Sequence, residues 1–145
     1  MKAQLRSSFL ILASILGSFS AGVQAASSDA GLCPSKEINA FLAAFSENSS
    51  VQEEFTNFPL KKTITVDAEP EPKQEATLIE RAKIVFPVIP DKKLRAVSGL
   101  EMQVMDSTGK VATVKLEKPD TDYQVIYIFK LSACWYLDEV KDYSL

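Results

Sequence analysis

Hydrophobic residues at helical spacing predict a helix early in the chain. The spacing of three and four residues places them in one apolar stripe, formed by Ile38, Phe41, Leu42 and Phe45. Pro34 and Ser35 suit the first turn of this helix, because the missing N–H of proline has no intrahelical partner there. Ser50, followed by Glu53, resembles a capping box and predicts a short second helix through Phe55.

From residue 58 onward, apolar residues recur at every second position, which is the period of a half-buried strand. This alternation predicts strands over residues 58–66 and 76–88, and then a hairpin over residues 100–117 that turns at residues 106–109. Pro87 indicates that the second strand ends at a sheet edge. Residues 89–99 form a basic connection to which the pattern assigns no element.

Two further strands are predicted over residues 123–131 and 135–143. The first is apolar on both faces and should be central in the sheet. On its aromatic face, Trp135 of the last strand would stack with Phe129 or Tyr127. The order of elements predicts an α+β domain, with N-terminal helices packed on a mostly antiparallel sheet of five or six strands.

Residues 1–25 have the three regions of a cleavable signal peptide. Lys2 and Arg6 supply positive charge, residues 9–16 are apolar, and Val23-Gln24-Ala25 has the small residues of a cleavage site. The alternative is a buried N-terminal helix. We therefore expect residues 26–145 to form one domain that is periplasmic or secreted and carries no stable membrane anchor.

The mature chain would keep both cysteines, Cys33 and Cys134. In an oxidising compartment, two cysteines in one small domain are expected to form a disulfide bond. Free thiols and an intermolecular bridge are the alternatives. The intramolecular bond would join the start of the domain to its last strand.

Charge adds a mild acidic excess. The whole chain has 16 basic and 19 acidic residues, and removing Lys2 and Arg6 leaves 14 against 19, a balance of −5. This argues against nucleic-acid binding, which requires clustered Lys and Arg.

The run DAEPEPKQE predicts an exposed, stiff loop. This loop is either a plain connection or a contact loop. In the second case a protein partner would contact its acidic residues, which are Asp67, Glu69, Glu71 and Glu75.

Two stretches of the sequence resemble a known family. FLAAFSENSSVQEEFTNFPL and the terminal WYLDEVKDYSL are similar to exported bacterial proteins of the nuclear transport factor 2-like fold, which are catalogued as a domain of unknown function. The resemblance spans about residues 37–145. It implies a curved sheet wrapped around the first helix, with a conical cavity between them. Some relatives bind small molecules or catalyse isomerisation or dehydration there, and others use the sheet for dimerisation or partner contacts.

The residues available for catalysis are few. The absence of histidine excludes Ser-His-Asp and Cys-His catalysis, His-ligated zinc, and the Asp–His pair on which enzymes of this fold often depend. All five glycines are isolated, so no phosphate-binding loop is present. The clustered carboxylates near the end of the chain are expected to be solvated, namely Asp120, Asp122, Asp138, Glu139 and Asp142. We expect no catalysis, cofactor or metal.

Three functional hypotheses follow. The first is an exported, non-catalytic binding protein that contacts a protein partner or a small ligand. Its pocket would be lined by residues that equally suit a solid core, namely Phe41, Phe45, Tyr123, Tyr127, Phe129 and Trp135. The second is a periplasmic inhibitor or immunity protein against a basic cell-wall-degrading enzyme. The third is a small-molecule enzyme. A homodimer through the outer sheet face, at Ile126 and Ile128, is a further hypothesis.

Overall fold

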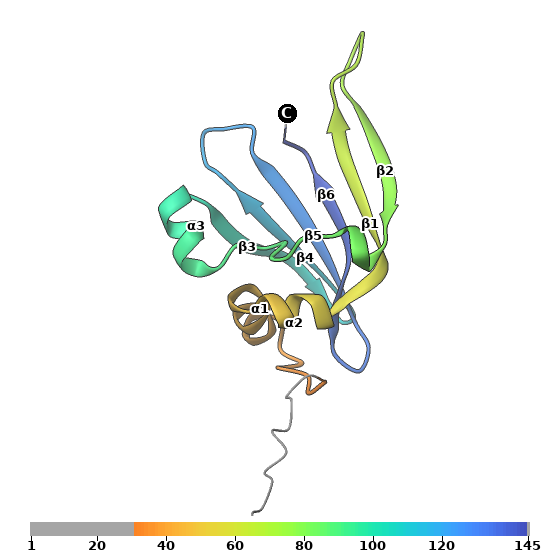
Figure 1. Ribbon diagram of the computed structural model, residues 1–145. Coiled ribbons are helices and arrows are strands. Elements are labelled where there is room, and N and C mark those ends of the chain that lie inside the picture. Colours follow the sequence, from red (N-terminus) through yellow and green to blue (C-terminus); the bar gives the residue numbers. More distant parts are fainter. Residues whose placement is uncertain (1–30, 145) are drawn as a thin grey trace, which may run out of the picture.

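The computed structural model describes residues 31–144, so the predicted signal peptide lies outside the described residues. Within this range, two helices precede a six-stranded sheet, which confirms the predicted α+β class (Figure 1). The elements are α1 (Ile38–Glu47), α2 (Ser49–Glu54), β1 (Thr56–Val66), β2 (Lys73–Ile79), the short 3-10 helix η1 (Arg81–Lys83), α3 (Lys92–Ser98), β3 (Glu101–Thr108), β4 (Val111–Glu117), β5 (Gln124–Leu131) and β6 (Trp135–Asp142). None of the described helices is long and apolar enough to cross a bilayer.

The strands follow the spatial order β2-β1-β6-β5-β4-β3. Every neighbouring pair is antiparallel except β1 and β6, which run parallel. As predicted, β5 is an interior strand of a mostly antiparallel sheet. Figure 1 shows α1 and α2 near one end of the sheet, whereas the turn between β1 and β2 projects at the other end.

A cluster of phenyl rings joins α1 to the sheet. Phe41 and Phe45 of α1 pack edge-to-face on Phe129 of β5, with ring centroids 5.9 and 5.2 Å from that of Phe129. All three side chains are fully buried. Edge-to-face pairs add about 0.5–1.5 kcal/mol each to the energy of burial. We call the sheet face that carries Phe129 the inner face; alternate residues along β5 place Val125 and Tyr127 on it as well.

Cys33 and Cys134 form a disulfide bond, and their Cα atoms lie 5.4 Å apart. The bond closes a loop across a sequence separation of 101 residues. In the chain-entropy model, a loop of this length stabilises the folded state by about 4–5 kcal/mol. The bond fixes the segment before α1 against the first residues of β6.

The predicted stacking of Trp135 is wrong. Trp135 is buried, but none of the aromatic pairs within residues 31–144 includes it. Its indole Nε1 instead donates a hydrogen bond of 2.9 Å to the carbonyl of Lys36. A buried indole N–H requires an acceptor, and the disulfide beside it brings the backbone before α1 within reach.

The starts of the first two helices differ from prediction. Helix α1 begins at Ile38, where the Glu37 carboxylate accepts hydrogen bonds from the backbone N–H groups of residues 39 and 40. These bonds lower the pKa of Glu37. Helix α2 is capped by Asn48 and not by Ser50. Glu53 pairs instead with Arg81.

The predicted strand over residues 76–88 is also wrong in its bounds. Strand β2 ends at Ile79, and it begins at Lys73, inside the predicted loop. Pro87 and Pro90 provide no N–H for a ladder, and residues 84–90 adopt no regular structure.

The sequence pattern missed α3. Its N-cap is Asp91, whose carboxylate accepts a hydrogen bond from Leu94 N, and it ends at Gly99 in the left-handed conformation. The apolar residues Leu94 and Val97 are exposed, so they form no buried stripe from which the helix could be recognised.

Candidate functional site

A half-open hollow of about 370 Å³ lies on the inner face of the sheet, beside the phenyl cluster. Its walls come from β1, β5 and β6, from the end of β2 and from the chain that follows it. The aliphatic lining residues are Leu60, Ile79, Ile84, Val85, Val88, Val125 and Val140, and the polar ones are Lys62, Lys83, Tyr123, Tyr127 and Asp142. Apolar walls with a few polar groups are typical of small-molecule sites, and the volume is within their usual range.

One wall of the hollow is an irregular segment, residues 84–90, which we call the strap. The side-chain amide of Gln52, on α2, holds it in place. Gln52 Nε2 donates a hydrogen bond of 2.8 Å to the Ile89 carbonyl, and Gln52 Oε1 accepts bonds of 2.7 and 3.0 Å from the N–H groups of Val88 and Ile89. Gln52 and Ile89 are both fully buried. The amide therefore satisfies backbone groups that would otherwise be buried without partners.

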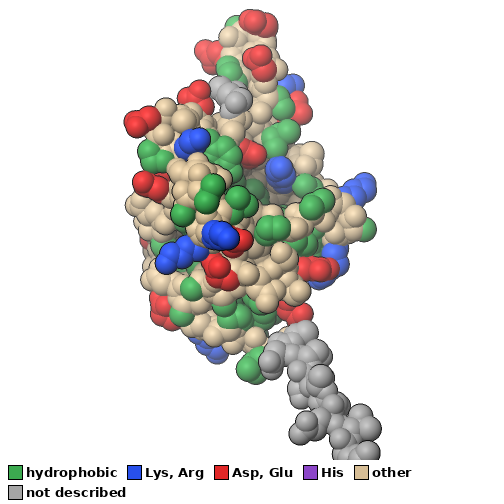
Figure 2. Space-filling view, turned by 60° about the vertical axis from the view of Figure 1, so that its left-hand side comes forward, with side chains coloured by type: hydrophobic (Ala, Val, Ile, Leu, Met, Phe, Trp, Pro, Cys, Tyr) green, Lys and Arg blue, Asp and Glu red, His purple; other side chains and the backbone are tan. Residues whose placement is uncertain are grey.

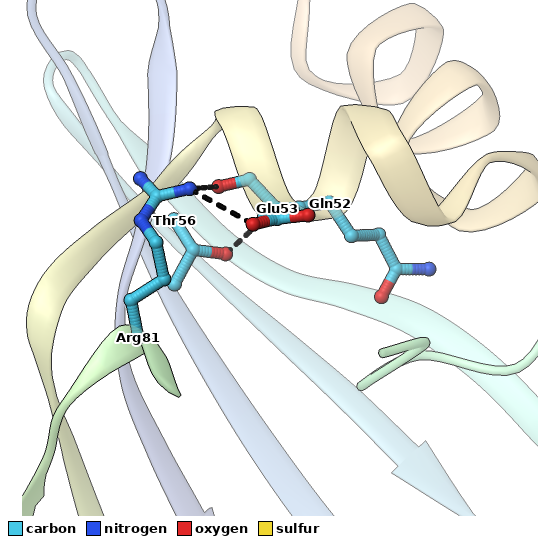
Figure 3. A network of polar contacts seen from close by, with 4 residues as sticks. All are labelled: Gln52, Glu53, Thr56 and Arg81. Carbon is cyan, nitrogen blue, oxygen red and sulfur yellow. Dashed lines mark hydrogen bonds and ion pairs between the residues drawn. The ribbon is translucent and has the colours of Figure 1, made fainter. Parts of the chain in front are cut away.

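Other contacts hold the chain on either side of the Gln52 contact. Figure 3 shows Arg81 donating from Nη1 to the Glu53 carbonyl and to its carboxylate, at 3.4 and 3.2 Å. The Arg81 guanidinium also lies 4.6 Å from the centroid of the Phe58 ring. In the same view, the Thr56 hydroxyl donates a 2.6 Å bond to the Gln52 carbonyl, where α2 meets β1. Beyond the strap, the Lys92 N–H donates to the Glu47 carboxylate at 2.8 Å.

Two tyrosines of the hollow remain protonated at neutral pH. Burial raises the pKa of Tyr127, and the nearby Tyr123 and Asp142 raise it further. Burial and then Asp142 also raise the pKa of Tyr123. The Tyr127 hydroxyl donates a 2.9 Å bond to the Val88 carbonyl of the strap. Both phenols are thus hydrogen-bonding groups at this pH, and neither is a base.

Only two of the six residues that were predicted to line a pocket lie at this hollow. Tyr123 and Tyr127 line it. The other four residues are buried in the core and do not line it, namely Phe41, Phe45, Phe129 and Trp135. The physical reason is that the rings of α1 meet Phe129 directly, which fills the space between helix and sheet. The open space lies farther along the inner face, next to the strap.

Sequence reasoning missed Lys62 and Lys83, and it placed Asp142 among the solvated carboxylates, although Asp142 lines the hollow. A signal for Lys62 was present, because strand alternation puts it on the same face as the buried Leu60. No such signal exists for Lys83, because the alternation predicts one continuous strand over residues 76–88.

The predicted partner loop forms the end of the β1–β2 hairpin. All four of its acidic residues are exposed, and Figure 2 shows acidic side chains gathered at this end of the molecule. Asp67, Glu69 and Glu71 lie in the turn. Glu75 belongs to β2, opposite Ile64, and pairs with Lys73 at 2.8 Å.

The remaining carboxylates near the C-terminus differ in their surroundings. Asp138 and Glu139 form ion pairs with Lys130 and Lys61, at 2.7 and 3.0 Å. Burial alone would raise the pKa of Asp138, but hydrogen bonds from Lys130 and Asn57 outweigh it and lower the pKa. Asp142 lines the hollow. Within residues 31–144, no group of three or more His, Cys, Asp or Glu side chains is arranged to hold a metal.

Comparison with known proteins shows the fold. No family model matches the sequence, and no curated protein matches it. Among solved structures, the chain is similar to an NTF2-like protein from Bacteroides fragilis NCTC 9343, with a TM-score of 0.54 and 17% sequence identity. The match covers 73% of this chain and 46% of that protein, so it spans less than half of the neighbour's length. The nuclear transport factor 2-like fold predicted from the sequence is thereby confirmed.

The hydrogen bonds of Gln52 predict that a substitution of similar size, Gln52→Leu, strongly lowers the free energy of unfolding. Gln52→Leu leaves one carbonyl and two N–H groups of the strap without partners, each worth roughly 1–3 kcal/mol if it stays buried. Because the strap can partly rehydrate, we expect the free energy of unfolding to fall by about 2–4 kcal/mol in urea denaturation. Gln74→Leu, at an exposed position of β2, is the control and should change it by less than about 0.5 kcal/mol. Equal stability of the two variants would contradict the role of Gln52.

Proposed function

We propose that this chain is an exported, non-catalytic binding protein that holds a small molecule in the hollow beside the strap. The observation that carries the proposal is the hollow itself, a half-open space of about 370 Å³ with aliphatic walls and five polar side chains. Its irregular wall is tied to α2 by Gln52 and to β5 by Tyr127. Such preorganisation reduces the entropy lost when a ligand binds.

The chemistry of the hollow supports binding rather than catalysis. The chain contains no histidine, and the raised pKa values of Tyr123 and Tyr127 keep both phenols protonated, so that neither can accept a proton as a general base. Asp142 is the single carboxylate among the lining residues, whereas glycosidase chemistry requires a facing pair. The disulfide bond supports export, because such bonds persist in oxidising compartments.

Binding can be tested with the neutral fluorophore N-phenyl-1-naphthylamine, which brightens in apolar surroundings. We expect saturable binding with one site per chain. Ile84→Trp places an indole in the hollow and should weaken binding at least about tenfold, or 1.4 kcal/mol. Ile126→Trp is the matched control, because Ile126 is also half-buried but lies on the outer face of β5. Absence of saturable binding, or equal binding by both folded variants, would overturn the proposal.

A second candidate function uses the other end of the molecule. The projecting hairpin turn and its exposed acidic residues (Figures 1 and 2) favour inhibition of a basic cell-wall-degrading enzyme, because complementary charge speeds association.

This candidate predicts that the protein slows peptidoglycan hydrolysis by at least one member of a panel of basic muramidases and amidases. The variant Asp67→Asn/Glu69→Gln/Glu71→Gln should lose the inhibition, because it removes the charges of the turn. The control removes three exposed acidic charges elsewhere, with Asp106→Asn/Asp120→Asn/Asp122→Asn. Unchanged hydrolysis across the panel with the natural chain would rule this candidate out.

A further inference from the structure

The charge of the hollow differs in sign from that of the whole chain. Lys62 and Lys83 line it together with one carboxylate, that of Asp142. The lining therefore carries one net positive charge, whereas the chain as a whole carries a formal net charge of −3. An acidic protein that has a cationic cavity favours anions there over the rest of its surface.

The two lysines of the hollow are not neutralised by the protein. Among residues 31–144, ion pairs engage Lys61, Lys73, Arg81, Lys115 and Lys130, and none engages Lys62 or Lys83. The adjacent pair Lys61 and Lys62 shows the contrast, since Lys61 bonds Glu139 at 3.0 Å while Lys62 is half-buried in the hollow wall.

Asp142 does not supply the missing counter-charge. Strand pairing sets it opposite Ile64 of β1 and Val125 of β5. Its carboxylate accepts a hydrogen bond of 3.1 Å from the Ser144 N–H, and it forms no ion pair within 4 Å among the described residues. The two ammonium groups are therefore available to a ligand.

Resting on the proposed function, we propose that the hollow selects an amphipathic monoanion, in which a carboxylate or a similar anionic group is joined to a compact apolar body. The anionic group bonds the ammonium groups of Lys62 and Lys83, and the Tyr123 hydroxyl, which is partly exposed and protonated, is a further donor. The apolar body lies against the aliphatic wall, which includes Leu60, Ile84, Val125 and Val140. Charge-assisted hydrogen bonds are about twice as strong as neutral ones, which provides selectivity over neutral analogues.

The contribution of the anionic group to affinity can be measured with a pair of probes. 8-Anilinonaphthalene-1-sulfonate and N-phenyl-1-naphthylamine share the same ring system and differ by one sulfonate. We expect the natural chain to bind the sulfonate about tenfold more tightly than the neutral probe. Lys62→Gln/Lys83→Gln should remove this preference, so that the ratio of the two affinities falls from about tenfold to about one. Lys93→Gln, an exposed change of the same kind on α3, should keep the preference.

The outcomes separate this inference from the function on which it rests. Equal affinity of the natural chain for both probes, with Ile84→Trp weakening both, overturns the anion preference and leaves the binding function standing. A sulfonate preference that survives Lys62→Gln/Lys83→Gln overturns the assignment of the two lysines. Failure of both probes to bind the folded natural chain overturns the proposed function itself. Thermal unfolding of each variant verifies that it is folded.

Discussion

The arrangement of the inner face depends on one buried amide. The Gln52 side-chain amide presents a donor and an acceptor to the backbone of Val88 and Ile89. It therefore makes the hydrogen bonds that the backbone of a neighbouring strand would make in a sheet. Without this contact, the Ile89 carbonyl and the N–H groups of Val88 and Ile89 could bond water only if the strap moved away from the inner face. The strap would then no longer form a wall of the hollow, and the Tyr127 hydroxyl would lose its acceptor.

The inner face is therefore covered in two different ways. Over Phe129, α1 packs rings directly onto the sheet and leaves no space for a ligand. Farther along β5, the cover is the irregular segment of residues 84–90, and a hollow remains between it and the sheet. A regular helix can fill the gap above a sheet through one continuous stripe, whereas an irregular segment cannot. This difference locates the proposed binding site beside the helix and not beneath it.

The sequence predicted the elements in which buried residues recur at a regular spacing. The stripe containing Phe41 and the alternation along β5 are periodic, so the class of fold and the aromatic core could be inferred from them. Helix α3 has no buried stripe, and the strap owes its position to Gln52, 37 residues before Ile89. No local pattern encodes such a contact. The strand pattern predicted that Trp135 would pack on the inner aromatic face, but its acceptor, the Lys36 carbonyl, became available only through the tertiary fold.

Backbone amide shifts in a solution NMR titration with N-phenyl-1-naphthylamine test most directly whether a small molecule binds beside the strap. We expect saturable shifts at the strap and at the start of β5, at Val85, Val88 and Val125, with little change at Phe41 in the solid part of the core. Shifts confined to the outer sheet face around Ile128, or to the hairpin turn, would contradict binding beside the strap.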